Sequence, residues 1–421
     1  MITNKETFLN NYLNQSALNE DLYPIVKEIC DQVKFRGDAA LKEYNLQLDK
    51  VETSQLEVPK EDLFTAYQRI DSSTREALEQ SHDRIKAYQT SIKQDHKQVH
   101  SECYELYHPL ERVGVYVPGG KASYPSTVLM TVTLAKVAGV KNIVAVTPPQ
   151  PEGLPDIVLA ACYIAGVDQV YQVGGAQSIA ALAYGTETIP KVDKIVGPGN
   201  QYVAYAKKYL FGQVGIDQIA GPSEIALIID QTADIEAITY DVFAQAEHDE
   251  LARTFVISED KDLLQQLENN IQHTMTQIKR QPIVDASLKH NHFLISVENF
   301  TEACDLMNQI APEHASIQTQ CPQDYVNHVK YVGALFLGHY SPEVIGDYVA
   351  GPSHVLPTNQ TARFTNGLSV NDFLTRHSVI DLSQQTFNNI EQSARKLAHI
   401  ERLYNHEKSI EIRTTKEPHN D

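Results

Sequence analysis

The chain has 421 residues, and its 35 basic against 54 acidic side chains give a net charge of −19. This length predicts roughly three domains of ~150 residues each. A composition with 42% hydrophobic residues and few Gly and Pro is typical of a soluble globular protein. So acidic a chain lacks the basic surface that attracts nucleic acids or anionic membranes, and we expect neither as a partner.

The five cysteines form an odd set with no CxxC pair, which fits a reducing compartment better than a disulfide scaffold. The N-terminal segment lacks the apolar core of a signal peptide. No run approaches the ~18 apolar residues of a membrane helix. These features predict a cytoplasmic protein.

Residues 1–108 are predicted to be helical, because apolar side chains recur on one helical face as far as Gly37. A second helix is expected after Pro59. Ser73 with Glu76 is interpreted as the capping box of a third helix that reaches about residue 93. No motif here points to chemistry, so this region is predicted to be structural.

From residue 112 onward, short apolar runs alternate with segments of helical period, which is typical of βαβ units and a largely parallel sheet. Strands are predicted at 113–116, 143–146, 170–173, 194–196, 225–229, 254–258, 292–297 and 334–337. Helices are predicted at about 126–138, 156–165, 176–184, 200–210, 233–248, 261–279 and 299–310. The end of the chain is predicted to form a helix at 390–404 and a short strand at 410–412.

Three glycine-containing loops follow predicted strands: VPGGK at 117–121, GGAQ at 174–177 and GPGN at 197–200. In open α/β sheets, ligands bind beyond the carboxyl ends of strands, where helix N-termini offer free N–H groups. None of the loops is a GxGxxG fingerprint, and no acidic residue follows at the expected distance. The residues therefore leave open a nucleotide site or simple tight turns.

The segment 216–248 contains a Gly-Pro-Ser turn, a buried strand and an amphipathic helix that ends in Gln245 and His248. Three residues apart, these two side chains project from the same helical face. The pair also fits an ordinary helix C-terminus, where His meets the negative end of the helix dipole. Gln is not a usual zinc ligand, so the residues alone favour the ordinary helix end. Asp241 is interpreted as structural.

In APEH at 311–314, Pro312 is expected to end a helix and to leave Glu313 and His314 on a loop. The two side chains are either separate proton-transfer groups or solvated residues. The Gly- and Pro-rich segment 346–354 is expected to place Asp347 and His354 in a second loop.

Glu401 and His406 flank the end of the last predicted helix. A spacing of five residues does not place both on one face of a regular helix. Taken alone, they are predicted to be surface residues.

Together these segments resemble the histidinol dehydrogenase family over nearly all of residues 20–415. The resemblance rests on long stretches of sequence. They are GDAALKEYN from 37, RVGVYVPGGKASYPSTVLM from 112, VGGAQSIAALAYGTETIPKVDKIVGPGN from 173, IDQIAGPSEIALI from 216, AQAEHDELA from 244, APEHASI from 311, GDYVAGPSHVLPTNQTARFTNGLSVNDFL from 346 and LAHIERLYNHEKSIEIR from 397.

The resemblance implies an oxidoreductase that converts L-histidinol, two NAD⁺ and water into L-histidine and two NADH through histidinal. It implies an α/β fold with two incomplete Rossmann-like domains, related to aldehyde dehydrogenases, in a zinc-dependent homodimer. The implied parts are an N-terminal helical region at 1–108, an NAD-binding domain at 109–235, a second α/β domain with the zinc and catalytic residues at 236–381, and a C-terminal tail at 382–421 that docks on the partner subunit.

The family's functional residues fall on matching positions of this chain. One zinc ion per subunit is implied on Gln245, His248, Asp347 and His406, and the catalytic pair on Glu313 and His314. Substrate contacts are implied for Ser223, Gln245, His248, His314, Asp347, His354, Glu401 and His406. NAD contacts are implied for Tyr116, Gln177 and Asn200. The family resembles a shared-site dimer, in which Glu401 and His406 reach the partner's active site.

These residue types suit the implied reaction. The amine and imidazole of histidinol are nitrogen ligands, so zinc would serve to orient the substrate. We expect His314 to take the alcohol proton and Glu313 to activate water for attack on the aldehyde. Glu401 is expected to bind the substrate amine.

Two other classes of protein are alternatives to a histidinol dehydrogenase. A thiol-dependent aldehyde dehydrogenase needs an activated cysteine, whereas the five here are predicted to be incidental. They are Cys30, Cys162 and Cys304 in apolar helical patterns, and Cys103 and Cys321 outside any glycine-rich turn. An inactive NAD- or metal-binding module would lack a base or a ligand, yet every position that the chemistry needs holds a competent residue.

Overall fold

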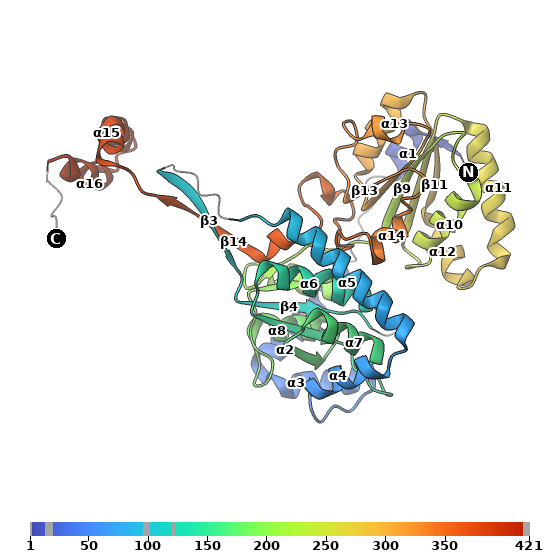
Figure 1. The fold of residues 1–421 in the computed structure, drawn as a ribbon, viewed down its shortest axis with the longest axis horizontal. Coiled ribbons are helices and arrows are strands. Elements are labelled where there is room, and N and C mark those ends of the chain that lie inside the picture. The colour runs from blue at the N-terminus through green and yellow to red at the C-terminus, as the bar shows by residue number, and fades with distance from the viewer. Residues whose placement is uncertain (1, 13–19, 96–101, 120–122, 416–421) are drawn as a thin grey trace. The chain divides into compact units, whose positions relative to one another are not determined.

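The computed structural model describes residues 2–12, 20–95, 102–119 and 123–415. The chain forms two compact units (Figure 1). The main unit comprises Met1–Lys93 and Pro109–Phe373, and the second unit comprises Gln94–His108 and Leu374–Asp421. Among the described residues, no helix combines the length and apolar character that a membrane crossing requires. The four-part division predicted at residues 108, 235 and 381 remains a proposal.

The first sheet of the main unit has the strand order β2-β6-β5-β4-β7-β8, parallel throughout except for the edge strand β2. Its strands are β2 (Glu57–Val58), β4 (Arg112–Tyr116), β5 (Asn142–Thr147), β6 (Gln169–Gln172), β7 (Lys194–Val196) and β8 (Gly215–Ile216). They are joined by α6 (Pro125–Ala138), α7 (Asp156–Ala165), α8 (Gly175–Tyr184) and α9 (Gln201–Leu210). The order reverses between β4 and β7, so the carboxyl ends of these two strands form the topological switch point where ligands of open α/β sheets bind.

The second sheet of the main unit has the order β1-β11-β10-β9-β12-β13, with all neighbouring strands parallel. Its strands are β1 (Thr3–Asn4), β9 (Glu224–Ile229), β10 (Arg253–Ser258), β11 (His292–Ser296), β12 (His314–Gln318) and β13 (Ala334–Leu337). Its helices are α1 (Lys5–Tyr12), α10 (Ile235–Ala246), α11 (Lys261–Thr274), α12 (Gln281–Asn291) and α13 (Phe300–Ile310).

Helices cover both faces of this second sheet, as Figure 1 shows. Successive strand residues point to opposite faces. Ala226 and Ile228 of β9 therefore join the core that includes Phe8 of α1 and residues of α13. Ile225 and Leu227 join the core formed with α10, α11 and α12. The near-continuous apolar run of β9 is explained by burial on both sides.

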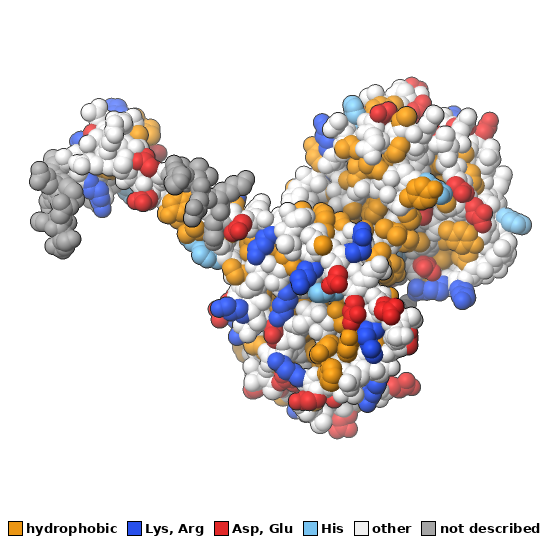
Figure 2. All heavy atoms as spheres, in the orientation of Figure 1, with side chains coloured by type: hydrophobic (Ala, Val, Ile, Leu, Met, Phe, Trp, Pro, Cys, Tyr) orange, Lys and Arg blue, Asp and Glu red, His pale blue; other side chains and the backbone are white. Residues whose placement is uncertain are grey.

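The remaining elements of the main unit are short apart from one long helix, α5. They are α2 (Tyr23–Arg36), α3 (Asp38–Tyr44), α4 (Lys60–Arg69), α5 (Ser72–Ile92), α14 (Glu343–Tyr348), η1 (Glu20–Leu22), η2 (Asn45–Asp49), η3 (Met275–Gln277), η4 (Pro322–Tyr325), η5 (Thr361–Arg363) and η6 (Val370–Phe373). Over α4 and α5, acidic and basic side chains are interspersed on the face shown in Figure 2. This arrangement is that of a solvated surface.

The predicted capping box of Ser73 and Glu76 is wrong, because the N-cap of α5 is Asp71. The Asp71 carboxylate accepts the Thr74 N–H at 3.0 Å and the Ser73 hydroxyl at 2.6 Å. A carboxylate at the positive end of the helix dipole is the stronger cap, and it starts the helix at Ser72.

The second unit pairs β3 (Cys103–Pro109) with β14 (Leu374–Ile380) and adds α15 (Gln384–Ile400) and α16 (Tyr404–Thr415). Two predictions are wrong here: residues 103–109 form a strand within the region predicted to be helical, and residues 410–412 are helical. The alternation of Ile410 and Ile412 resembles a strand. Charged helix formers surround them, however, and Lys408 pairs with Glu411 at 3.1 Å with i,i+3 spacing.

Candidate active site

The predicted catalytic pair lies at the amino ends of β12 and its neighbour β9, two interior strands of the second sheet. Glu313 directly precedes β12 and His314 is its first residue. The prediction that His314 lies on a loop is therefore wrong. It pairs in register with Ile225 of β9 on one side and Ala334 of β13 on the other. A strand hydrogen-bonded on both sides holds the imidazole more rigidly than a loop would.

Glu313 is buried and held by two donors from the start of β9. The Ser223 hydroxyl donates to its Oε2 at 2.6 Å, and the Glu224 N–H donates to the same oxygen at 3.0 Å. Ser223, a predicted substrate contact, thus positions the carboxylate. Burial raises the pKa of Glu313 above its usual range, so the carboxyl can exchange a proton nearer to neutral pH.

The orientation of His314 follows from one backbone contact. Its Nδ1 lies 3.0 Å from the backbone carbonyl oxygen of Glu224. A carbonyl only accepts, so Nδ1 carries the proton and donates, which leaves Nε2 as the nitrogen that can take up a proton. This is the tautomer that a general base requires.

Three buried or partly buried carboxylates surround His314. Burial by itself would lower the pKa of His314, but the charges of Glu313, Glu343 and Asp347 outweigh it and raise this pKa to about 9. Glu343 Oε1 and Glu313 Oε2 each lie 3.8 Å from Nδ1. Without a compensating cation, this field favours the imidazolium form at neutral pH.

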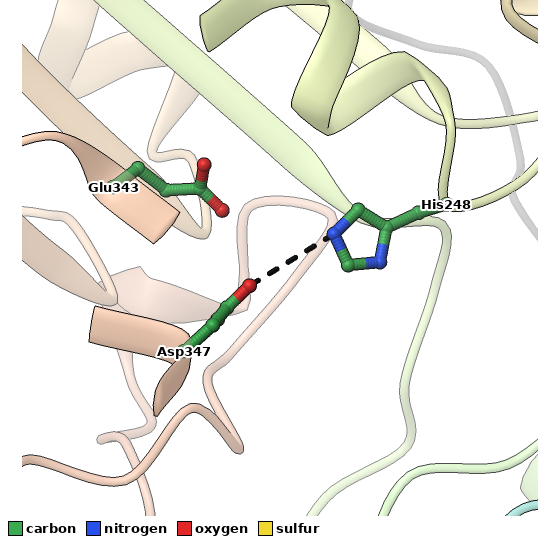
Figure 3. A group of neighbouring side chains, drawn as sticks. All are labelled: His248, Glu343 and Asp347. Atoms are coloured by element: carbon green, nitrogen blue, oxygen red, sulfur yellow. Dashed lines mark ion pairs between the residues drawn. The ribbon is translucent and has the colours of Figure 1, made fainter. Parts of the chain in front are cut away.

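His248, Glu343 and Asp347 form a cluster whose ligand atoms lie within 4.8 Å of one another (Figure 3). His248 Nε2 lies 3.9 Å from Asp347 Oδ2. The prediction that Asp347 lies in a loop is wrong, because it belongs to the short helix α14. Glu343 stands one helical turn before it and shares its face. Glu343 is not among the residues predicted from the sequence; a helix predicted at 343–348 would have placed it on the same face as Asp347.

Polar atoms without partners mark this cluster as a place for a cation. Both amide atoms of Gln245, at 0% exposure, and both carboxylate oxygens of Glu343, at 1%, have no hydrogen-bond partner within the described part of the chain. Buried polar groups are normally satisfied. The imidazole nitrogen of His248 and the carboxylate oxygens of Asp347 and Glu343 are ligand types that zinc takes, and they lie close enough together to share one ion. The residues present therefore fit the implied metal.

A cavity of about 340 Å³ adjoins this cluster, a size suited to a small ligand. Three predicted residues line it, namely His314, Asp347 and His354. His354 lies in a loop, as predicted, with Nδ1 3.1 Å from the Asp347 carbonyl oxygen. Burial lowers the pKa of His354, so its imidazole is neutral at pH 7. A hollow of about 700 Å³ between β2 and α7 contains none of the predicted residues.

The predicted cofactor residues lie at the carboxyl ends of strands in the first sheet. Tyr116 ends β4, and its hydroxyl accepts the N–H of Gly175 at the start of α8 at 3.4 Å. In the same first turn of α8, Gln177 is buried, and its Oε1 has no partner among the described residues. Asn200 caps α9 by accepting the Val203 N–H at 3.2 Å. Two helix N-termini and an unpaired buried acceptor fit a dinucleotide at the switch point.

The loops bearing these residues approach one another closely. Gly197 has φ +110°, and a Cβ built there would lie 2.2 Å from the backbone oxygen of Tyr116. Only glycine lets the loop at 197–200 rest against the end of β4. In the first loop, Gly120 and Lys121 lie outside the described residues.

Glu401 and His406 belong to the second unit, whereas the cluster consists of main-unit residues. Glu401 is the C-cap of α15 and His406 lies in the first turn of α16. Both side chains are exposed.

Comparison with known proteins decides the family. The histidinol dehydrogenase family profile matches residues 13–414. The histidinol dehydrogenase of Staphylococcus saprophyticus is 78% identical over 421 residues, covering 100% of both chains. That of Staphylococcus aureus strain COL is 67% identical over 412 residues, covering 97% of this chain and 99% of the relative. The chain belongs to the histidinol dehydrogenase family.

The crystal structure of histidinol dehydrogenase from Elizabethkingia anophelis has the same fold. It superposes with a TM-score of 0.94 at 32% identity and covers 98% of this chain and 97% of that one. The predicted α/β fold and the prediction of an oxidoreductase of this family are confirmed.

Burial argues against three of the five cysteines as the nucleophile of a thiol mechanism. Cys30, Cys162 and Cys304 lie in helices, as predicted, and burial raises the pKa of their thiols to about 12, 12 and 11. A protonated, buried thiol is a poor nucleophile. Cys103 and Cys321 are exposed.

Proposed function

We propose that the chain oxidises L-histidinol to L-histidine through histidinal, with zinc and two molecules of NAD⁺. One observation carries the proposal: a His oriented as a base and a carboxylate held by two donors stand beside a cluster that fits a cation. The direct test is NADH formation by the purified zinc-loaded protein. We expect NADH to appear with L-histidinol and not with a simple primary alcohol. Zinc-loaded protein that forms no NADH with L-histidinol would refute the proposal.

In the first oxidation, Nε2 of His314 takes the proton of the substrate hydroxyl. When bound, NAD⁺ would supply the acceptor for the hydride of the carbon that bears this hydroxyl. The Glu224 carbonyl holds Nδ1–H, so the imidazole keeps its orientation as it becomes charged. The carboxylates of Glu313 and Glu343 stabilise that imidazolium.

Glu313 acts in the second half of the reaction. Its carboxylate takes a proton from water as the water oxygen bonds to the aldehyde carbon. The imidazolium of His314 gives its proton to the aldehyde oxygen, so the hydrate forms and His314 returns to its neutral state. His314, again neutral, takes a hydroxyl proton of the hydrate, whose hydride would pass to a second NAD⁺. The product is the carboxylate of histidine.

Gln245, His248 and Asp347 are the main-unit residues that would hold the zinc ion, with His406 of the partner subunit completing the set. When bound, zinc would orient the amine and imidazole of the substrate and offset the carboxylate charge around His314. Ser223 and His354 are proposed to contact the substrate, and Glu401 of the partner subunit to bind its amine. Tyr116, Gln177 and Asn200 are proposed to contact NAD⁺.

Glu313→Gln should slow aldehyde oxidation more than alcohol oxidation. The amide keeps an oxygen for the Ser223 and Glu224 donors but cannot take a proton from water, so we expect a loss of about 10²-fold or more with histidinal. Single-turnover NADH formation from histidinol and from histidinal separates the two steps. Glu298→Gln, an exposed control just before α13, should leave both rates unchanged. Normal histidinal oxidation by the Glu313 variant would exclude water activation by this residue.

The second unit has the character of a docking element. Its helices expose large apolar side chains, including Leu397 at 61%, Ile400 at 63% and Tyr404 at 60%. Apolar surface of this kind usually meets a partner. We propose that it docks on a second copy of the chain in a homodimer.

The free cysteines agree with the reducing cytoplasm predicted for this protein.

Complementation between subunits tests the shared site. His248→Ala and His406→Ala proteins should each be inactive as homodimers, because each lacks one proposed zinc ligand. In a mixed dimer, one of the two sites would have both histidines, so activity should return to as much as half of that of the wild type. Differently tagged subunits, purified through both tags, give the required species. Purified mixed dimers without activity would show that the sites are not shared.

A further inference from the structure

A buried ion pair holds the loop at 197–200, which carries Asn200. Lys207 Nζ lies 2.7 Å from Asp217 Oδ1, and the side chains are only 4% and 3% exposed. Lys207 Nζ also donates to the Gly197 carbonyl oxygen at 2.6 Å. The second carboxylate oxygen of Asp217 accepts the Gly197 N–H at 2.7 Å. Charged side chains therefore fix the backbone on both sides of Gly197.

The contacts of this ion pair indicate that it positions the loop at 197–200 rather than stabilising the fold as a whole. A buried ion pair adds little stability compared with well-packed apolar side chains of similar volume. Apart from the Gln218 N–H, which Asp217 Oδ1 accepts at 2.7 Å, the backbone groups that bond to the charged atoms belong to Gly197. The positive φ of Gly197 and its contact with Tyr116 set the course of the loop. The ion pair thus determines where the N-terminus of α9 and Asn200 stand at the switch point.

Asp217 also begins a segment that leads to the catalytic carboxylate. Along it, the Gly221 N–H donates to Thr358 Oγ1 at 2.6 Å. Six positions after Asp217, Ser223 donates to Glu313 at 2.6 Å. One short, tethered stretch therefore joins the side chain that holds the loop to the side chain that holds Glu313.

We propose that Lys207 and Asp217 are positioning residues that fix the loop at 197–200 for NAD⁺. They also keep the position of this loop constant relative to Glu313. They act through Gly197 and do not touch the substrate. The inference rests on the proposed NAD-dependent function and adds to it the residues that set the geometry of the cofactor loop.

The test compares Lys207→Met with the double variant Lys207→Met/Asp217→Asn. The double variant is neutral and close in volume to the native pair, so it tests the proposal even where the single variant, with a lone buried carboxylate, fails to fold. We expect the Kd for NAD⁺, measured by calorimetry, to rise at least tenfold. KM for NAD⁺ should follow, and amide hydrogen exchange at 197–200 should accelerate. KM for histidinol and zinc content should stay within twofold of the wild type.

Lys136→Met is the matched control. Lys136 also pairs with an aspartate, Asp168, at 2.9 Å, and this carboxylate accepts the Ile143 N–H at 2.8 Å. That pair stands near the amino end of β5, whereas the loop at 197–200 follows the carboxyl end of β7. NAD⁺ binding should therefore be normal. Wild-type NAD⁺ affinity in the folded double variant would overturn the inference alone. Wild-type protein that binds no NAD⁺ would overturn the proposed function as well.

Discussion

Replacing His314 with Asn should reduce NADH formation from both histidinol and histidinal by about 10³-fold or more. Each half-reaction needs a proton acceptor beside the carbon that loses hydride, and general-base catalysis contributes about 10²–10⁴-fold. Asn keeps an N–H that can donate to the Glu224 carbonyl, so the strand environment is preserved. It has no basic nitrogen. Steady-state rates with each substrate measure the effect.

Two controls separate this loss from unfolding. His273→Asn changes an exposed histidine of α11 and should leave turnover unchanged. Thermal unfolding and zinc content of the His314 variant should match those of the wild type. A folded, zinc-loaded His314→Asn protein that retains a tenth of wild-type turnover would rule out His314 as the base.

Removing the metal should abolish turnover, and zinc should restore it. Without a cation, the buried carboxylates around His314 favour its protonated form. The substrate then also lacks the metal ion that would orient its amine and imidazole. Holoprotein should also be more stable, by about 2.7 kcal/mol when free zinc is a hundred times its Kd. Dialysis against a chelator, followed by zinc titration with parallel rate and unfolding measurements, gives both quantities.

The ligand assignment can be tested without turnover. Gln245→Ala and Asp347→Ala should each weaken zinc binding at least tenfold, because each removes a proposed coordinating oxygen. Gln265→Ala, on the exposed face of α11, should bind zinc like the wild type. Unchanged zinc affinity in the Gln245 variant would remove this residue from the metal site. Full activity in rigorously metal-free protein would contradict the role of zinc altogether.

The local hydrophobic pattern of the sequence predicted many of the strands and helices of the main unit. Buried strands such as 225–229 and helices such as 156–165 are confirmed, because hydrophobic period and Gly or Pro breaks are local signals. β12 was missed: it has only five residues, HASIQ, and both ends are polar. The six-residue helix α14 is too short to show a helical period. These two elements carry His314, Asp347 and Glu343, so the least predictable elements hold central residues of the site.

The position of the proposed catalytic pair could not be predicted from sequence for a second reason. The usual expectation places functional residues at the carboxyl ends of parallel strands. This holds for the proposed cofactor residues Tyr116 and Asn200, which stand at the switch point of the first sheet. Glu313 and His314 stand instead at the amino end of β12, beside Ser223. Strand order and register decide which ends meet, and both depend on contacts between distant segments.

The number of NADH molecules formed per histidinol consumed tests the central claim most directly. Zinc-loaded protein with excess NAD⁺ and a limiting, weighed amount of L-histidinol should release two NADH per substrate, with histidine as the product. A base and a water-activating carboxylate in one site account for both oxidations. One NADH per histidinol, with histidinal accumulating, would contradict the proposed roles of His314 and Glu313.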